Sequence, residues 1–179
     1  LALLVTSPNL LGAVIWIVIE SPGSPFFRQR RVGKDNQDFM LIKLRTMVKN
    51  AESKGSGLAV DQNDSRILKS GALLRRLSID ELPNLLNVLK GEMSIIGPRP
   101  TVRAQVDKYN EHQLRRLEVK PGITGWAQVN GLRGETETLD KMRARVQYDI
   151  DYMRNWSLGF DLMIIGKTLL VVWRDQNAY

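Results

Sequence analysis

Two adjacent carboxylates, Asp80 and Glu81, lie in the segment RRLSIDELP (residues 75–83), whose side chains are the best suited to chemistry in this sequence. Ser78 followed three residues later by Glu81 matches a helix capping box, so one interpretation is purely structural. The other is catalytic, because the first turn of a helix keeps a carboxylate ionised and offers N–H groups to a phosphate. Asp80 could then attack phosphorus, while Glu81 holds Mg²⁺, which prefers one or two carboxylates plus phosphate oxygens. Arg75 lies five residues before Asp80 and could hold a phosphate.

Two further segments could bind a substrate. In GPRP (residues 97–100) the prolines fix the backbone around Arg99, which suits a guanidinium aimed at a phosphate; the alternative is a turn with an exposed arginine. In PGITGWAQVNG (residues 121–131) the glycines permit close backbone approach, and Gln128 and Asn130 could read a base or a sugar. Neither GxxxxGK[ST] nor GxGxxG occurs, so the standard nucleotide-binding loops are absent from the sequence.

The elements that must position these residues follow from periodicity. FMLIKLRTM (residues 39–47) predicts a strand with Lys43 and Arg45 on the same face. Residues 120–131 hold too much Gly and Pro for regular structure, and the polar residues 51–65 predict a loop. Helices are expected over residues 67–77, 80–90 and 102–117, and an amphipathic helix carries the stripe Leu139, Met142, Val146, Ile150 and Met153.

The two ends of the chain are strongly apolar. Residues 1–19 carry no charge, and Pro8 near their middle disfavours a straight helix, so we expect a helix–break–helix that enters one leaflet of a membrane and returns. A core helix kinked at Pro8 and a membrane-spanning helix are the alternatives. FFRQRRV (residues 26–32) is basic and aromatic, as expected where a chain leaves a membrane. Residues 156–174, strongly apolar but interrupted by Asp161 and Lys167, predict an interfacial helix or a core helix.

Composition narrows the chemistry. The net charge of +7 suits a polyanionic partner: nucleic acid, an anionic membrane or a phosphorylated substrate. No nucleic-acid-binding motif is present, and we expect no such partner. The absence of cysteine excludes disulfides and thiol chemistry. The single histidine, His112, lies in a polar run typical of a solvated helix surface. Acid–base chemistry is therefore expected from carboxylates, lysine or tyrosine.

Taken together, five segments in this order resemble the bacterial sugar transferase family of monotopic polyprenyl-phosphate phosphoglycosyl transferases. They are FFRQRRVG, KLRTM, SIDELPNLLNVLKGEMSIIGPRP, KPGITGWAQVNG and YDIDYMRNWSLGFDL. The resemblance implies an α/β, α-rich fold in two parts: a re-entrant membrane hairpin over residues 1–22, broken at Ser7–Pro8, and a compact cytosolic catalytic domain with amphipathic interfacial helices over residues 23–179. The basic stretch usual ahead of the hairpin is absent, so we expect the hairpin to be truncated at its start.

The resemblance also implies the roles of individual residues. Asp80 and Glu81 match a catalytic dyad in which the Asp forms a covalent phosphosugar intermediate and the Glu binds Mg²⁺. Basic positions that look like phosphate binders fall on Arg45, Arg75 and Arg99. The predicted substrate site is completed by Lys43, Gln128, Asn130, Asp149 and Asp161, the last two being acidic positions of less certain role.

The implied reaction transfers a sugar 1-phosphate from a UDP-sugar to polyprenyl (undecaprenyl) phosphate, releases UMP and starts exopolysaccharide or other glycoconjugate synthesis. The stretch GLRGETETLDKMRARVQYDIDYMRNWS resembles glucose-1-phosphate transferases, which favours UDP-glucose. The expected partners are the two substrates, Mg²⁺ and membrane lipid at the cytoplasmic face of the bacterial inner membrane; a homodimer is compatible with the sequence but not established by it. A catalytically idle scaffold of the same fold, and another phospholipid-linked transferase or hydrolase, are the alternatives.

Overall fold

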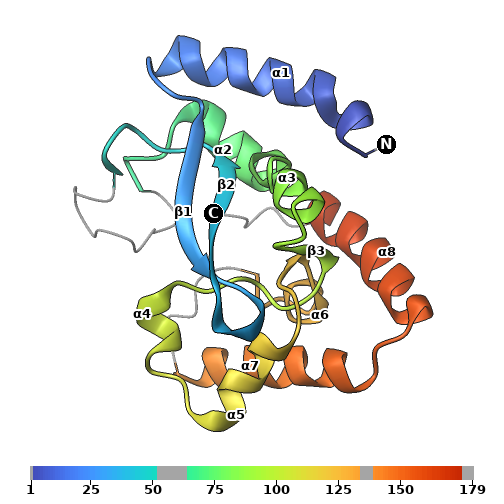
Figure 1. The fold of residues 1–179 in the computed structure, drawn as a ribbon. Helices are drawn as coiled ribbons and strands as arrows, with labels where there is room; N and C mark the ends of the chain where they lie inside the picture. Colours follow the sequence, from blue (N-terminus) through green and yellow to red (C-terminus); the bar gives the residue numbers. More distant parts are fainter. Residues whose placement is uncertain (1, 52–63, 134–138, 175–179) are drawn as a thin grey trace.

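The structure, a computed structural model, describes residues 2–51, 64–133 and 139–174 and combines helices with two small sheets (Figure 1). The α/β, α-rich class predicted from the sequence is confirmed, whereas the loop expected over residues 51–65 falls almost entirely outside the described residues. In chain order the elements are α1 (Ala2–Glu20), β1 (Phe26–Val32), η1 (Lys34–Asn36), β2 (Asp38–Leu44), α2 (Lys69–Arg76), η3 (Ile79–Glu81), α3 (Asn84–Leu89), β3 (Ser94–Ile96), α4 (Arg103–Val106), α5 (Glu111–Leu114), η4 (Arg115–Glu118), β4 (Gly122–Thr124), α6 (Trp126–Val129), α7 (Leu139–Arg154) and α8 (Leu158–Arg174).

Strands β1 and β2 form an antiparallel hairpin, with Phe26 opposite Leu44 and Val32 opposite Asp38. The turn between them places Asp35 and Asn36 in the left-handed region, with φ of 53° and 61°, which Asp and Asn tolerate better than most residues. The predicted strand over residues 39–47 is thus confirmed as β2. The basic FFRQRRV segment, expected at a membrane exit, is β1, whose side chains alternate between exposed and partly buried.

Strands β3 and β4 form a short parallel pair. The neighbouring loops approach so closely that a side chain on Gly97 would lie 2.5 Å from the carbonyl oxygen of Lys120, and one on Gly122 would lie 2.1 Å from the backbone nitrogen of Gly97. The irregular segment expected over residues 120–131 therefore contains a strand and one helical turn, α6. Its glycines permit the backbones to meet, as the sequence indicated.

Helix α1 lies along one side of the molecule and packs against α2 and η3 (Figure 1). Ala13 and Ile17 are buried in a core cluster with Leu44, Leu68 and Leu74, while much of the opposite face of the helix is exposed. The break predicted at Ser7–Pro8 is not seen, because α1 continues through both residues as one helix. The re-entrant hairpin is therefore not confirmed. Among the described residues, no helix is long and apolar enough to cross a membrane.

The predicted helices are shorter and more broken than periodicity indicated. Residues 67–77 contain α2, as expected, but residues 80–90 divide into η3 and α3 at Pro83, and residues 102–117 divide into α4, α5 and η4. The last division has a local cause, since Asn110 and Gln113 form a reciprocal capping box that starts a new helix. His112 lies exposed on α5, in agreement with the solvated helix surface predicted for it.

Helix α7 carries the amphipathic pattern predicted for it, and α8 is the strongly apolar helix that residues 156–174 indicated. Val146 and Ile150 of α7 are buried, with Met142 and Met153 partly so. Ile164 of α8 is fully buried in a cluster with Ile96, Val129 and Tyr152. The outer side of α8 exposes a group of large apolar side chains: Leu158, Leu162, Met163, Ile165, Leu169 and Leu170. Helix α8 is therefore apolar both on the side that packs against the core and on much of the side that faces outward.

Gly71 allows α2 to pack closely against the backbone of Thr46, just after β2. A Cβ there would lie 2.0 Å from the carbonyl oxygen of Thr46, which is backbone and cannot move aside. We expect Gly71→Ala to lower the free energy of unfolding by at least about 3 kcal/mol, at the upper end for overpacking. Gly166→Ala is the matched control, since a Cβ at that position in α8 meets nothing within 4 Å; it should raise stability by up to about 1 kcal/mol. Denaturant unfolding of both variants measures the difference, and equal effects would contradict the packing argument.

Candidate active site

The two buried carboxylates, Asp80 and Glu81, follow a residue with an unusual backbone conformation. Helix α2 ends at Arg76, Ser78 adopts a left-handed conformation with φ of 58°, and η3 then carries Asp80 and Glu81, each 8% exposed. The hydroxyl of Ser78 accepts a hydrogen bond from Arg133 and caps no helix. The capping-box interpretation of Ser78 and Glu81 is therefore wrong, because the Glu81 side chain is used elsewhere. A left-handed serine stores backbone strain, a feature that clusters at functional sites.

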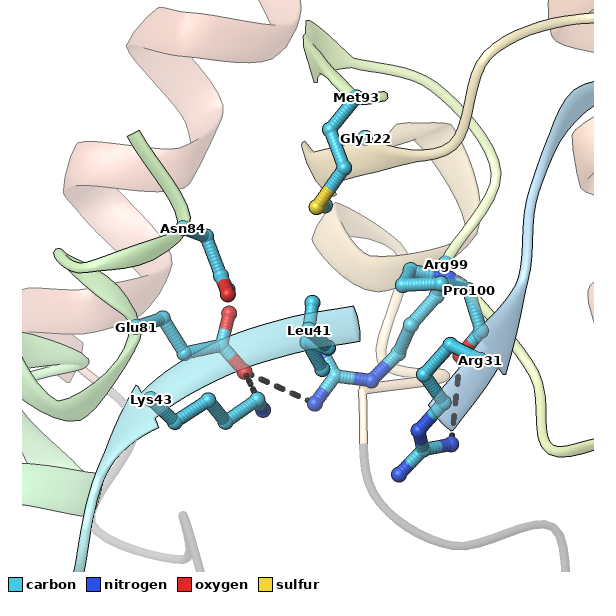
Figure 2. A pocket seen from close by; sticks show the side chains of 9 residues that line it. All are labelled: Arg31, Leu41, Lys43, Glu81, Asn84, Met93, Arg99, Pro100 and Gly122. Atoms are coloured by element: carbon cyan, nitrogen blue, oxygen red, sulfur yellow. Dashed lines mark hydrogen bonds and ion pairs between the residues drawn. The ribbon is translucent and has the colours of Figure 1, made fainter. Parts of the chain in front are cut away.

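Glu81 is the centre of a compact charge cluster. Its Oε1 accepts a hydrogen bond from Lys43 Nζ at 2.7 Å and one from Arg99 Nη2 at 2.8 Å (Figure 2). Burial opposes ionisation of Glu81, but the charges of Arg99 and Lys43 outweigh it and hold the pKa of this carboxyl well below its usual range. Burial lowers the pKa of Lys43, against the attraction of Glu81. Three residues from three distant segments, β2, η3 and the GPRP loop, thus meet at one carboxylate oxygen.

Asp80 differs from its neighbour. Burial raises the pKa of Asp80 to about 6, an effect reinforced by Glu81 and opposed by Lys43, Arg75 and Arg99. Within the described ranges of the chain, its carboxylate has no hydrogen-bond or ion-pair partner. A buried carboxylate that is ionised near neutral pH and held by no partner is well suited to attack an electrophile. The two carboxylates of the dyad are therefore electrostatically distinct.

Arg75 lies at the same centre, where its charge acts on Asp80. Its Nε donates a hydrogen bond to Thr46 Oγ1 at 2.8 Å, which fixes the stem of the side chain against the end of β2. Its carbonyl oxygen accepts a bond from Arg133, the same residue that holds Ser78. Arg133, which the sequence did not single out, therefore stabilises the turn before the dyad.

A small pocket opens on the Glu81 side of the dyad. It is lined by Arg31, Leu41, Lys43, Glu81, Asn84, Met93, Arg99, Pro100 and Gly122. Asn84 is 2% exposed and its Oδ1 has no hydrogen-bond partner. Figure 2 shows the end of this side chain directed toward Glu81, on the side away from Lys43 and Arg99. An unpartnered buried amide oxygen beside a carboxylate is an arrangement that a cation would satisfy.

The carboxylate of Glu81 and the amide oxygen of Asn84 are suitable ligands for Mg²⁺. The described part of the chain contains no group of three or more His, Asp or Glu side chains that could hold a metal alone. Mg²⁺ does not need one, because it usually takes one or two carboxylates and completes its shell with water and substrate phosphates. Glu81 and Asn84 are therefore the residues that could hold it, with Asp80 adjacent in sequence.

The loop that carries Arg99 is held at successive carbonyl groups. Gly122 N donates to Pro98 O at 2.9 Å, Arg116 Nη2 to Arg99 O at 2.9 Å, and Val32 N to Thr101 O at 2.8 Å. The rigid presentation of Arg99 predicted from its flanking prolines is thus reinforced by hydrogen bonds from three other segments. Its guanidinium points at Glu81 rather than at solvent (Figure 2).

Three of the predicted substrate-binding residues bond to backbone outside the dyad. Arg45 is buried and donates to the carbonyl of Ser21, just after α1. Gln128 Nε2 donates to Ile123 O at 3.1 Å and Asn130 Nδ2 to Trp126 O at 2.7 Å, both within their own loop. These contacts hold the local backbone, and a role for the three side chains in substrate binding stays a prediction.

The two predicted acidic positions are also used internally. Asp149 of α7 is 2% exposed and pairs with Arg116 at 2.7 Å. Asp161 accepts hydrogen bonds from Tyr152 Oη at 2.9 Å and Trp156 Nε1 at 3.2 Å, which join the end of α7 to the start of α8. The structure thus gathers Asp80, Glu81, Lys43, Arg75 and Arg99 into one centre and leaves the other predicted residues around it.

The geometry defines a carboxylate dyad surrounded by cations, of the kind that phosphoryl-transfer chemistry requires. The family model for bacterial sugar transferases matches residues 1–175, and the chain belongs to this family. The chain is 44% identical, over its whole length, to UDP-glucose:undecaprenyl-phosphate glucose-1-phosphate transferase of Xanthomonas campestris pv. campestris, and covers 38% of that protein. It is 46% identical to the enzyme of the same name from Caulobacter vibrioides, with 97% of this chain and 66% of that protein aligned.

A third relative differs in the sugar of its name. The UDP-N-acetylgalactosamine-undecaprenyl-phosphate N-acetylgalactosaminephosphotransferase of Aeromonas hydrophila is 42% identical over 96% of this chain and 41% of its own length. The chain therefore spans about two-fifths of the Xanthomonas and Aeromonas relatives. Similarity at this level is shared by proteins named for different sugars, so identity alone does not select the donor.

Proposed function

We propose that this chain transfers a sugar 1-phosphate from a UDP-sugar to undecaprenyl phosphate, releasing UMP, and so starts the synthesis of an exopolysaccharide. The observation that carries the proposal is the contrast within the dyad: Asp80 is buried and has no hydrogen-bond or ion-pair partner among the described residues, whereas Glu81 is held by two cations. The names of the relatives support the same reaction. UDP-glucose is the favoured donor, with UDP-N-acetylgalactosamine as the competitor that the Aeromonas relative provides.

The reaction would proceed in two displacements at the same phosphorus atom. A carboxylate oxygen of Asp80 forms a bond to the β-phosphorus of the UDP-sugar, and the bond from that phosphorus to the bridging oxygen breaks, so UMP leaves with the bridging oxygen. A phosphate oxygen of undecaprenyl phosphate then attacks the phosphorus of the aspartyl-phosphosugar, which releases Asp80 and gives the sugar diphosphate-lipid. Positioning and charge neutralisation are the main demands of such a step.

The surrounding residues would meet these demands. Arg99 and Lys43 lie within hydrogen-bond distance of Glu81, at the edge of the pocket where the diphosphate must enter. The charge of Arg75 also acts on Asp80. Glu81 and Asn84 would hold Mg²⁺, which when bound neutralises charge on the phosphate oxygens. Because Asp80 and Glu81 are each only 8% exposed, charges close to them act more strongly than they would in solvent.

The lipid acceptor requires a membrane surface close to the site. Helices α1 and α8 both expose large apolar side chains, including Ile19 at 76% and Leu158 at 71%. We infer that these faces rest in the cytoplasmic leaflet of the bacterial inner membrane, where a soluble UDP-sugar and undecaprenyl phosphate can meet. The exposed apolar side of α8 supports this placement.

The test is UMP release from a panel of UDP-sugars, with the protein in nanodiscs and with or without undecaprenyl phosphate and Mg²⁺. We expect sustained release from one sugar only when acceptor and metal are both present. Without acceptor, a burst of up to one UMP per protein should appear, as a covalent intermediate requires. Silence across the panel from folded protein would instead favour a catalytically idle scaffold, and turnover without any burst would contradict the aspartyl intermediate.

The pH dependence of the reaction follows from Asp80. The nucleophile must be ionised, and its pKa lies near 6, so the proton that blocks attack is lost as the pH rises through this value. We expect kcat/KM for the UDP-sugar to fall about tenfold for each unit of pH below 6 and to level off above it. Steady-state kinetics between pH 5 and 8, at saturating Mg²⁺, measure the profile. A flat profile over this range would show that ionisation of a group with a pKa near 6 does not limit the reaction.

A further inference from the structure

Arg116 lies behind the active site with no direct contact to the dyad. It is 3% exposed on η4 and makes four polar contacts through its two terminal nitrogens. Nη1 donates to Thr101 Oγ1 at 3.0 Å and to Tyr109 Oη at 2.8 Å. Nη2 donates to the carbonyl oxygen of Arg99 at 2.9 Å and pairs with Asp149 Oδ2 at 2.7 Å. One buried guanidinium thus joins α7 to the loop that carries Arg99.

The partner of Arg116 is equally enclosed. Asp149 is 2% exposed; burial raises the pKa of its carboxyl, against the opposing charges of Arg116 and of Arg145, which lies on the same helix. Arg145 is itself held by the carbonyl of Leu132 at 2.9 Å. Asp149 therefore orients Arg116 from α7.

The buried ion pair between Arg116 and Asp149 is not well explained by a contribution to stability alone. Removing two charges from water costs nearly as much as their attraction returns, and apolar residues of the same volume often stabilise a core better. A guanidinium fork does what an apolar side chain cannot: it donates several hydrogen bonds in fixed directions at once. Here one of those bonds goes to the backbone of Arg99, whose side chain reaches Glu81 at 2.8 Å.

We propose that Arg116, oriented by Asp149, is a positioning residue that fixes the backbone of Arg99 and so aims the Arg99 guanidinium at the substrate phosphates. The inference rests on the proposed function only in taking a phosphate to be the ligand of Arg99. A small rotation about the Arg99 backbone would swing its long side chain away from Glu81 and the pocket. Without Arg116, the Arg99 guanidinium is still present, but its orientation is no longer fixed.

The experiment is a double-mutant cycle between Arg116→Lys and Arg99→Ala, read out by kcat/KM for the UDP-sugar and by calorimetric affinity for UDP. Lysine keeps the charge next to Asp149 but cannot make the forked contacts of arginine. In the otherwise native protein, Arg116→Lys should lower UDP affinity and kcat/KM about tenfold or more; in the Arg99→Ala background it should lower them less than twofold. Arg115→Lys is the matched control, since Arg115 is adjacent, exposed and paired with Glu118 at 3.5 Å, and it should change neither quantity.

A merely structural role gives a different result. If Arg116→Lys lowers both quantities by the same factor with and without Arg99, Arg116 does not act through Arg99 and the proposal is overturned. If Arg116→Lys does not fold, as judged by its melting profile, Asp149→Asn takes its place in the same cycle with the same expectation. UDP binding needs no turnover, so the cycle still decides the question if no UDP-sugar releases UMP. An Arg99→Ala variant that binds UDP normally would overturn both the phosphate role of Arg99 and the positioning role built on it.

Discussion

Asp80→Asn is expected to reduce UMP release by at least about a thousand-fold while making the folded protein more stable. The loss of activity follows because an amide oxygen cannot form the acyl phosphate. The gain in stability follows from the pKa of about 6 that burial imposes on Asp80. This value lies above that of the unfolded chain, so the stability that Asp80 contributes is fully present below pH 4 and is lost as the pH rises through 6. At pH 8 the ionised carboxylate destabilises the fold by up to about 3 kcal/mol, which asparagine avoids.

The comparison needs a second aspartate replaced in the same way. Asp140 on α7 has a side chain that is 91% exposed and pairs with Arg143 at 3.5 Å, so Asp140→Asn should change neither activity nor stability appreciably. Denaturant unfolding at pH 8 and pH 4.5 should show the advantage of Asp80→Asn shrinking at the lower pH. Residual turnover above about one per cent of wild type would exclude Asp80 as the nucleophile. An unchanged stability at pH 8 would mean that Asp80 is not held as a buried charge.

The centre of the site could be predicted from the sequence because its key residues are neighbours. Asp80 and Glu81 are adjacent, and the prolines around Arg99 announce a fixed backbone without reference to the rest of the chain. Strand β2 and the apolar stripe of α7 were also predictable, since periodicity within one element reports which face is buried. Each of these predictions depends on local chemistry alone.

The use of Glu81 could not be predicted in this way. A capping box and a catalytic carboxylate have the same sequence pattern, and the outcome is decided by Lys43, 38 residues away, and Arg99, 18 residues away. The left-handed Ser78 likewise receives a hydrogen bond on its hydroxyl from Arg133, 55 residues away in the sequence. Long-range electrostatics therefore overrides the local capping preference at this position.

Polar residues near the site were harder to assign for the opposite reason. Gln128 and Asn130 have side chains able to hydrogen-bond to a substrate, but their amide nitrogens donate to backbone carbonyl groups a few residues away. Arg116 lies in the run RRLE, where nothing distinguishes it from the exposed Arg115 except the tertiary fold. Pro8 is a strong local signal that does not break the helix: α1 continues through it, although the residues that bury α1 in the core, Ala13 and Ile17, lie in its second half.

Glu81→Gln is expected to damage both the metal site and the fold. Glutamine is nearly isosteric but carries no charge, so Lys43 and Arg99 would face each other across a neutral amide in a largely buried site. Breaking such a pair costs on the order of 3 kcal/mol of stability. We also expect kcat to fall by at least about a hundred-fold and the Mg²⁺ concentration for half-maximal rate to rise. Denaturant unfolding, Mg²⁺ titration of UMP release and Mn²⁺ binding by electron paramagnetic resonance measure the three effects.

Two further variants separate the metal role of Glu81 from its role in the charge cluster. Glu118→Gln is the matched control, because the Glu118 side chain is 56% exposed and pairs with Arg115 at 3.5 Å; it should leave stability, rate and metal binding unchanged. Asn84→Leu removes the buried amide oxygen beside Glu81 without disturbing its ion pairs, so it should weaken Mn²⁺ binding with a smaller loss of stability than Glu81→Gln. If both Glu81→Gln and Asn84→Leu bind Mn²⁺ as wild type does, the metal is held elsewhere, and Glu81 serves only to neutralise Lys43 and Arg99. If only Glu81→Gln loses Mn²⁺ binding, the carboxylate is the metal ligand and the Asn84 oxygen is not.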